Sequence, residues 1–391
     1  MFGLYETAFG ALTWGNILMI VIAAGLIYLG VAKDFEPILL VPIGFGMIMT
    51  NIPLGGLMIY TPDGMPAESA TIGQLLTDIG DGKMGLFNVL YAYGLKSELI
   101  PFLIFLGLGA LIDFSPTIAR PISLFFGATA QLGVFVVFLI AYASGLFTVN
   151  EAACVGIIGG SDGPPTIYLT AALAPHLLGP IALAAYSYMA MVPIIQPPVI
   201  RLLTTKKERA IYMKPQIREV SKMELIIFPI LIFVVAALIV PKSVPIIGML
   251  MFGNLLRVTG VTDRLAQSAG TVFIDVLTFL LGVTVGGLMT AEIFLQARTL
   301  IIFGLAALAF VFSTMGGVLG AKFVNLFLKE KINPMIGAAG VSAVPMSARV
   351  VQRMGQKANP RNFLLMHAMG PNTAGVIGTA VVTGIIYGML K

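Results

Sequence analysis

The chain has 391 residues, of which 58% are hydrophobic and only 10% are charged, and its formal net charge is +5. Soluble domains carry roughly 25% charged residues, so this composition excludes a soluble globular protein and predicts an integral membrane protein. One cysteine, Cys154, excludes internal disulfides and cysteine-based metal sites, and two histidines are too few for a zinc cage. In such a chain the positive charge indicates membrane orientation and no nucleic-acid partner.

Long apolar runs occur along the whole chain. Many of them approach the roughly 20 residues that a helix needs to cross a bilayer. We therefore expect an all-α polytopic membrane protein with about ten helices, and we expect Asp34 and Glu36 to mark the end of a span. The runs cover residues 17–31, 35–58, 100–112, 121–148, 179–203, 225–241, 270–290, 299–320 and 372–390.

Two polar segments separate groups of these runs. The insert 54–99 is acidic in its polar part and is expected on the side of the membrane opposite the loop 201–222. The loop 201–222 is expected in the cytoplasm, because Lys and Arg close to span ends resist translocation. It holds much of the positive charge, at Arg201, Lys206, Lys207, Arg209, Lys214, Arg218 and Lys222.

An internal repeat is visible on either side of the basic loop. GIIGGSDGPPT (156–166) aligns with GAAGVSAVPMS (337–347) at one spacing, and similar pairs precede both stretches. We therefore expect a first membrane repeat at 1–200, which contains the insert, and a second at 223–391. An odd number of spans in each half would invert the second, as in many secondary transporters, although a parallel arrangement is left open by the sequence.

Both repeated stretches carry Gly, Pro and Ser, which break a helix. Broken backbone at membrane depth is tolerated only where it is buried in protein or lines a wet cavity. We expect such a broken or re-entrant segment near the bilayer midplane in each half, with Asp162 in the first and Ser342 in the second. A carboxylate at that depth is a functional candidate by default. The alternative is that Asp162 belongs to a solvated surface turn.

Four further residues have two interpretations each. Asn333 could coordinate Na+ or cap a helix before Pro334, and Arg349 could clamp a carboxylate or anchor the chain in the cytoplasm. Tyr188 could donate a proton inside an apolar span, although most membrane tyrosines lie in interfacial belts. Asn372 lies in GPNTAG, where another apolar run is interrupted. With no nucleotide-binding or metalloprotease motif present, the residues alone indicate a Na+- or H+-coupled carrier of a small anion.

The chain also resembles a known family along nearly its whole length. The similarity is carried by DFEPILLVPIGFGMIMTNIP (34–53), VGIIGGSDGPPTIYLT (155–170), AAYSYMAMVPIIQPP (184–198), KINPMIGAAGVSAVPMSARV (331–350) and NFLLMHAMGPNTAGVIG (362–378). These stretches resemble the β subunit of the sodium-pumping biotin-dependent decarboxylases, which act on oxaloacetate, methylmalonyl-CoA or glutaconyl-CoA.

The resemblance implies a function in the inner membrane of a bacterium or archaeon. A biotin carrier/carboxyltransferase subunit (α) would deliver carboxybiotin, and this subunit would decarboxylate it, consume a proton and export Na+. A small γ subunit and a homo-oligomer within the complex are also implied. A Na+-coupled carboxylate carrier without decarboxylation is the alternative. Ser161 and Pro164-Pro165 depart from the pattern expected in the oxaloacetate branch and weaken assignment to it.

The resemblance also implies roles for individual residues. Each carried-over residue matches a position of the family's motifs, and Asn372 is added from the GPN motif. The expected catalytic residues are Asp162, Tyr188 and Arg349; the expected contacts to the biotin group are Arg349, Ser342 and Gly337; and the expected Na+ ligands are Asp162, Asn333, Ser342 and Asn372.

Overall fold

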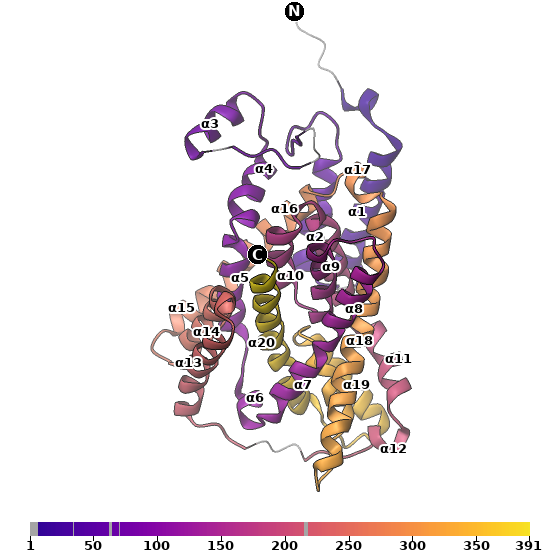
Figure 1. The fold of residues 1–391 in the computed structure, drawn as a ribbon, viewed down its shortest axis with the longest axis vertical. Coiled ribbons are helices and arrows are strands. Elements are labelled where there is room, and N and C mark those ends of the chain that lie inside the picture. Colours follow the sequence, from indigo (N-terminus) through magenta and orange to yellow (C-terminus); the bar gives the residue numbers. More distant parts are fainter. Residues whose placement is uncertain (1–6, 34, 62–64, 70, 215–217) are drawn as a thin grey trace, which may run out of the picture.

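The protein is described by a computed structural model that covers residues 7–33, 35–61, 65–69, 71–214 and 218–391. Asp34 and parts of the insert and of the basic loop lie outside the described residues. Within these ranges the chain is helical, and the only β pairing is a single bridge between Tyr60 and Pro66. Figure 1 shows the helices as one elongated bundle.

The prediction of an all-α polytopic protein is confirmed. In the described part, seven helical segments are long and apolar enough to cross a membrane, and an eighth is added if Leu86–Lys96 and Leu99–Leu111, bent by 60°, form one span. The seven segments are Trp14–Lys33, Ile122–Ala143, Pro175–Leu203, Lys222–Ile239, Asp263–Gly287, Ala297–Phe327 and Leu365–Leu390.

The helices of the first part of the chain are α1 to α12, of which α12 lies within the basic loop. Their bounds are α1 Trp14–Lys33, α2 Pro37–Thr50, α3 Ile72–Gly80, α4 Leu86–Leu90, α5 Leu99–Leu111, α6 Ser115–Ala119, α7 Ile122–Ala130, α8 Leu132–Ala143, α9 Val149–Gly156, α10 Gly163–Leu173, α11 Leu178–Leu203 and α12 Lys206–Arg209.

The remaining helices follow the basic loop. Their bounds are α13 Lys222–Ile239, α14 Val244–Val258, α15 Asp263–Ser268, α16 Ile274–Gly287, α17 Ala291–Phe294, α18 Ala297–Phe327, α19 Met346–Ala358 and α20 Leu365–Leu390.

The helices of the two expected halves pack against each other reciprocally. Helix α2 packs on α16, and α5 packs on α14. Both contacts depend on glycine: a Cβ on Gly46 would lie 2.4 Å from the Val283 carbonyl oxygen, and one on Gly253 would lie 2.0 Å from the Leu106 oxygen. Small residues let helix backbones approach closely in membranes. This exchange of contacts is what a two-fold relation between the halves would produce, and the division into two repeats stays a prediction.

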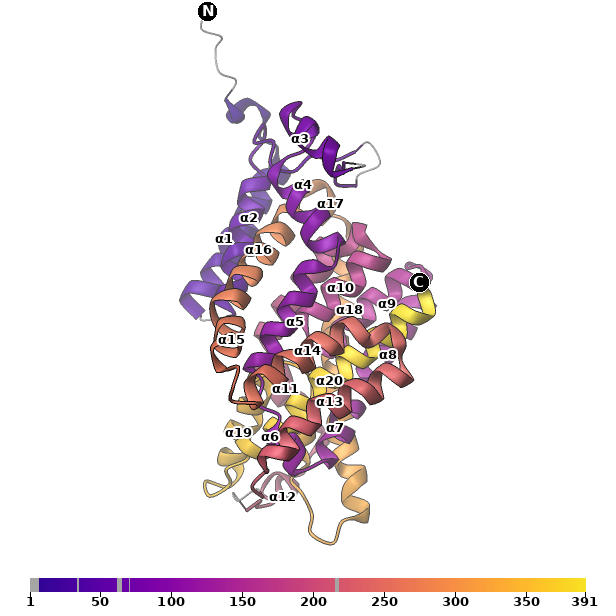
Figure 2. The same ribbon diagram turned by 90° about the vertical axis from the view of Figure 1, so that its left-hand side faces the viewer.

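The polar segments lie at opposite ends of the molecule. Figures 1 and 2 both show α3 and α4 of the insert at the upper end and α12 of the basic loop at the lower end. The two broken elements also approach from different ends, because α9 and α10 lie in the upper half of the view and α19 in the lower half (Figure 1). The structure therefore brings two helix breaks together inside the bundle.

Each break has a defined local structure. After α9 a 3-10 turn ends at Gly160, and α10 begins at Gly163. In the second half a 3-10 helix over Pro334–Gly340 precedes an irregular segment that ends where α19 begins. A large apolar cluster that includes Phe126, Ile158, Phe310 and Ala338 surrounds both breaks. The sequence motifs thus lie in the packed core of the molecule.

Candidate functional site

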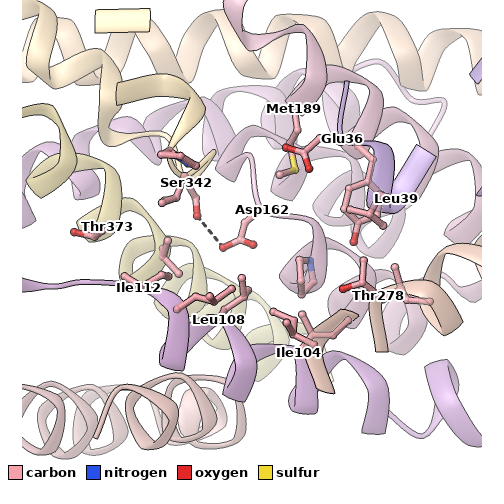
Figure 3. Close-up of a pocket in the computed structure, with 18 of the residues that line it drawn as sticks. Glu36, Leu39, Ile104, Leu108, Ile112, Asp162, Met189, Thr278, Ser342 and Thr373 are labelled. Atoms are coloured by element: carbon pink, nitrogen blue, oxygen red, sulfur yellow. Dashed lines mark hydrogen bonds between the residues drawn. The ribbon is translucent and has the colours of Figure 1, made fainter. Parts of the chain in front are cut away.

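The two breaks meet at Asp162 and Ser342. The Ser342 amide donates to the carbonyl of Gly160 at 3.1 Å, and its hydroxyl donates to the Asp162 carboxylate at 2.8 Å. Asp162 is only 6% exposed and Ser342 5%. Figure 3 shows the two side chains pointing toward each other. This burial contradicts the alternative in which Asp162 belongs to a solvated surface turn.

The sequence around Asp162 explains why its carboxylate is available. Ser161 adopts a left-handed conformation (φ 58°), which ends the 3-10 turn, and Pro164 lies in the first turn of α10, where a missing N–H costs nothing. Asp162 occupies the N-cap position, yet its side chain makes no capping bond. Its backbone carbonyl instead accepts the Thr166 hydroxyl at 2.7 Å. The carboxylate therefore remains free to meet Ser342 and a ligand.

Polar side chains from the long helices satisfy the carbonyls that the breaks leave without helical partners. Buried carbonyls need such partners because water is excluded from the core. The Asn372 amide nitrogen donates to Val341 at 2.7 Å and to Ala339 at 3.0 Å. In the same way Gln196 donates to Ala338, Ser313 to Gly159 and Thr379 to Gly160, at 3.0, 2.7 and 3.3 Å. The helices α11, α18 and α20 thus hold both breaks in place.

A cavity of about 440 Å³ adjoins the meeting point of the breaks. Its lining includes three carboxylates, of Asp162, Glu36 and Asp113, and the phenol of Tyr186. Among the described residues that line it there is no Lys, Arg or His. Figure 3 shows Ser342 and Thr373 on one side of Asp162 and Glu36 and Thr278 on the other. Such a lining attracts cations and offers the oxygen ligands that hard cations prefer.

The expected Na+ ligands separate into two groups. Asp162 and Ser342 line the cavity, and Asn372 holds the segment that carries Ser342. The Asn372 Oδ1 atom is buried and has no hydrogen-bond partner within the described chain. Asn333 lies elsewhere: its Nδ2 donates to Arg209 and Ile211 carbonyls at 2.8 and 3.1 Å, and its Oδ1 accepts the Met335 amide. The helix-capping alternative for Asn333 is the arrangement that the structure shows.

The other expected site residues do not line the cavity. Gly337 lies against α18, where a Cβ would come 2.0 Å from the Gly317 carbonyl oxygen, so its role here is close packing. Tyr188 is half-buried, with its ring centroid 6.0 Å from that of Phe310. Arg349 is exposed on α19, on the side that also presents Arg353. The structure therefore joins Asp162 and Ser342 without bringing Tyr188, Gly337 or Arg349 to them.

The tyrosine that reaches the cavity is Tyr186. It is 2% exposed, and its ring lies against α10, where a Cβ on Gly163 would come 2.1 Å from its Cε1 atom. Side chains two apart on a helix point in different directions, so only one tyrosine of the pair 186 and 188 can face α10. The resemblance indicated Tyr188. Glycine at 163 was the one sequence signal for a ring packed on this turn.

Comparison with known proteins gives one consistent result. The Na+-transporting oxaloacetate decarboxylase beta subunit family matches residues 15–390 of the chain. The chain is 52% identical to the methylmalonyl-CoA decarboxylase subunit beta of Propionigenium modestum over 98% of its own length and 97% of that protein. It is 46% identical to the glutaconyl-CoA decarboxylase subunit beta of Acidaminococcus fermentans (98% and 96%). It is 44% identical to the oxaloacetate decarboxylase beta chain of Klebsiella pneumoniae (95% and 94%).

Proposed function

Because this chain belongs to the Na+-transporting oxaloacetate decarboxylase beta subunit family, we propose that it couples the decarboxylation of carboxybiotin to Na+ export through Asp162. The single observation that carries the role of Asp162 is its position at the junction of the two breaks, in a cavity with three carboxylates and no described basic residue. A buried carboxylate in such a cavity needs a cation or a proton to balance its charge. Both species are part of the reaction.

We place Na+ on the carboxylate of Asp162 and the hydroxyl oxygen of Ser342. The unpartnered Oδ1 atom of Asn372 is a further ligand in this proposal, because a buried carbonyl oxygen without a partner is costly unless something fills its place. Asn333 was expected in the same set from the resemblance, but its Oδ1 caps the second break by accepting the Met335 amide, and its Nδ2 donates to two carbonyls of the basic loop. Its contribution is to fix the start of the second break.

Asp162 is also the proposed exchange point between Na+ and the proton that decarboxylation consumes. A carboxylate can hold one or the other, so binding of a proton releases the ion and the reaction becomes coupled to transport. We do not place the biotin group beside Asp162, because the described lining offers its carboxylate no positive partner. Arg349 and Tyr188, which the resemblance implies as catalytic residues, lie outside this lining.

The assembly is a multi-subunit decarboxylase. We propose that a biotin carrier/carboxyltransferase subunit and a small membrane subunit are its partners, that the β chain forms a homo-oligomer, and that the complex lies in a bacterial or archaeal cell membrane. The basic end is proposed to face the cytoplasm. A pocket of about 330 Å³ at this end, lined by Arg201, Lys206, Arg209 and Lys357, supports that orientation.

We further propose that the complex decarboxylates an acyl-CoA. The alignments with the methylmalonyl-CoA and glutaconyl-CoA decarboxylase subunits are 385 positions long and cover 98% of this chain, so they contain very few gaps. The alignment with the Klebsiella oxaloacetate relative needs 409 positions to cover 95%, which means many more gaps. The departures at Ser161 and Pro165 agree with this difference. Assay of the assembled complex with malonyl-type acyl-CoA and with oxaloacetate tests the proposal.

The function is tested with purified protein in proteoliposomes, by measuring CO₂ release from free carboxybiotin and Na+ movement together. We expect Na+-dependent CO₂ release accompanied by Na+ transport, and loss of both in Asp162→Asn. Asp275→Asn is the matched control, because Asp275 is an exposed carboxylate on α16 that is not part of the cavity lining. Na+ and a carboxylate crossing together without CO₂ release would instead establish the carrier alternative.

A further inference from the structure

The pocket at the basic end of the molecule is lined mostly by cations. It has a volume of about 330 Å³ and lies between the end of α11, the short helix α12 and the last turns of α19. Figures 1 and 2 both show α12 and α19 toward the lower end. A cavity lined by one sign of charge concentrates ions of the opposite sign. The described lining of this basic pocket has four cations and no acid: Arg201, Lys206, Arg209, Met354, Lys357 and Ala358.

The positive charge of the basic pocket is not balanced by neighbouring acids. The side chains of Arg201, Lys206 and Lys357 form no ion pair or hydrogen bond with any residue that the structure describes. The carboxylate of Glu208 on α12 caps the start of its own helix, pairs with Lys322 at 3.0 Å and does not line the pocket. Cations held around one cavity repel each other, and an anion bound between them removes that repulsion.

Arg209 is held in position by the backbone next to the pocket. Its Nη1 donates to the carbonyl of Thr204 and, at 3.2 Å, to the hydroxyl of the same residue. All the described hydrogen bonds of this guanidinium use Nη1, so Nε and Nη2 can donate to a bound anion. A guanidinium is a planar fork of donors that matches oxyanions, and less entropy is lost when the fork is already fixed.

The arrangement of the cations favours a phosphate group over a carboxylate. The four cations come from three helices, so they approach a bound ion from different directions. A carboxylate presents two oxygens in one plane, whereas a phosphate presents several strong acceptor oxygens around a tetrahedral centre. Next to Arg201, Leu202 is 83% exposed at the end of a segment long enough to cross a membrane. Basic pockets in such positions bind phospholipid headgroups.

All three walls of the basic pocket are joined to the second break. Helix α12 is joined to it because Asn333, at the start of the break, donates to the Arg209 carbonyl at 2.8 Å. Helix α11 is joined through Gln196, which donates to the Ala338 carbonyl at 3.0 Å. Helix α19 follows the break directly in the chain. An anion that bridges the three walls therefore stabilises the position of the break, which carries Ser342.

We propose that the basic pocket binds a phosphate group, supplied by an anionic phospholipid or by a soluble phosphate, and that its occupancy favours Na+ binding at Asp162. Arg209 and the three cations without described partners donate to the phosphate oxygens. The binding of phosphate goes beyond the proposed function and does not depend on it. The effect on Na+ rests on the proposed function, because it takes Na+ as the ion bound at Asp162.

The first test measures phosphate binding to the purified full chain. Thermal unfolding is followed in a neutral detergent while choline phosphate replaces choline chloride at constant ionic strength. A ligand that binds only the folded state raises its stability with concentration. We expect phosphate to stabilise the wild type, and we expect Lys206→Gln and Lys357→Gln each to need about tenfold more phosphate for the same rise. Lys357→Arg, which keeps the charge, is expected to shift less.

Two matched variants separate a built site from a general positive field. Lys207→Gln removes a charge from α12 and Arg353→Gln removes one from α19, and neither residue lines the pocket. Both are expected to respond to phosphate as the wild type does. No stabilisation of the wild type, or equal shifts from Lys206→Gln and Lys207→Gln, would overturn the site. Equal stabilisation by succinate, a dicarboxylate, would overturn the preference for phosphate.

Nanodiscs distinguish the two sources of the phosphate group. The unfolding titration is repeated in nanodiscs of phosphatidylcholine, with and without phosphatidylglycerol. If the anionic lipid occupies the pocket, it will stabilise the wild type more than Lys357→Gln and remove the response to added phosphate. If a soluble phosphate is the ligand, the response to added phosphate will be the same in both kinds of nanodisc. Both results retain the site and assign its occupant.

The second test measures the coupling between the basic pocket and Asp162. Na+ replaces choline in the same unfolding assay, with and without phosphate. Coupling between two binding sites is reciprocal, and we expect phosphate to lower the half-saturating Na+ concentration about fivefold. Lys357→Gln should remove this effect, whereas Asp162→Asn should lose the response to Na+ and keep the response to phosphate.

The outcomes of the two tests are separable. If Na+ does not stabilise the wild type, the proposed Na+ site fails, and the first test still decides whether the basic pocket binds phosphate. If the wild type responds to both ligands but its Na+ response is the same with and without phosphate, the coupling is overturned and the phosphate site is retained.

Discussion

Ser342 and Asp162 lie 180 residues apart in the sequence, and the Ser342 hydroxyl donates to the Asp162 carboxylate at 2.8 Å. One residue comes from each broken element. The proposed ion site therefore exists only when the two breaks are docked on each other, and the amide of Ser342 reinforces this docking through the Gly160 carbonyl. Any motion that separates the breaks would change the ligands of the ion.

Ser342→Ala removes the hydroxyl and leaves the Asp162 carboxylate without its protein donor. Hydrogen bonds to charged groups contribute about 1.5–3 kcal/mol, so we expect the half-saturating Na+ concentration to rise by about one to two orders of magnitude. The measurement is decarboxylation against Na+ concentration. Ser268→Ala, which loses only an exposed bond to the Arg264 carbonyl, is the control and should leave the curve unchanged. Identical curves for the two variants would contradict the assignment.

Asn372→Ala tests whether the second break is held from α20. The substitution removes the donor to the Val341 and Ala339 carbonyls, which are then buried without it. We expect a loss of about 1–3 kcal/mol in unfolding free energy. Denaturant titration in detergent micelles measures it.

The same variant also tests the proposed ion ligand. If Asn372 Oδ1 contributes to the site, Na+ will stabilise Asn372→Ala less than the wild type. Gln196→Ala is the matched comparison: it removes the amide donor to Ala338 but no residue of the proposed ion site. A normal Na+ response in Asn372→Ala together with reduced stability would limit Asn372 to a structural role.

The fold class follows from the apolar runs, but element bounds depend on local contacts that the runs do not reveal. The run 35–58 predicted a span, whereas α2 ends at Thr50. The next residue, Asn51, donates to Met47 and Met289 carbonyls, and this tertiary contact ends the helix. Helix α14 was not predicted, because it has only 15 residues and carries Arg257 in its last turn.

The position of Asp162 at the break was predictable from the sequence, and its burial decides between the two interpretations that the sequence left open. Asn333 fits both a cap and an ion ligand, and only the contacts to the basic loop decide between them. Glu36 was expected only to mark a span end. Its place in the cavity lining was not predicted, because it depends on a left-handed backbone conformation that no sequence motif specifies.

Gly163→Ala tests the contact between α10 and Tyr186. An added Cβ would lie 2.1 Å from the ring, so either the ring or the start of α10 must move. Overpacking of this kind costs about 1–3 kcal/mol, and we expect reduced stability together with reduced Na+-dependent activity. In a protein that already carries Tyr186→Ala, the further change Gly163→Ala should cost little additional stability, because the ring is then absent.

Gly304→Ala on α18 is the matched control for this prediction. A Cβ there meets no atom within 4 Å, and alanine is the better helix former by about 0.5–1 kcal/mol. We therefore expect opposite signs for the two alanine substitutions in the same denaturant titration. Stabilisation by Gly163→Ala would show that the ring moves away without cost.

Glu151→Gln tests the ion pairs at the outer ends of α9 and α10, the two helices on either side of Asp162. Glu151 lies in the first turn of α9. It pairs with His176, which follows α10, and with Arg298 of α18, each at 2.7 Å. The Glu151 side chain is only 6% exposed, whereas those of His176 and Arg298 are 46% and 36% exposed, so solvent screens the pairs from the cationic side only. We expect a loss of about 1.5–3 kcal/mol in unfolding free energy, because charge-assisted bonds are replaced by neutral ones.

Glu68→Gln provides the contrast for Glu151→Gln. It breaks the pair with Lys96 at 2.5 Å, in which both side chains are substantially exposed. Exposed pairs contribute about 0–1 kcal/mol and weaken with salt. We expect the effect of Glu151→Gln to persist at high salt and that of Glu68→Gln to vanish. Equal effects for the two substitutions would mean that α9 and α10 are held by the packing around them and not by the ion pairs of Glu151.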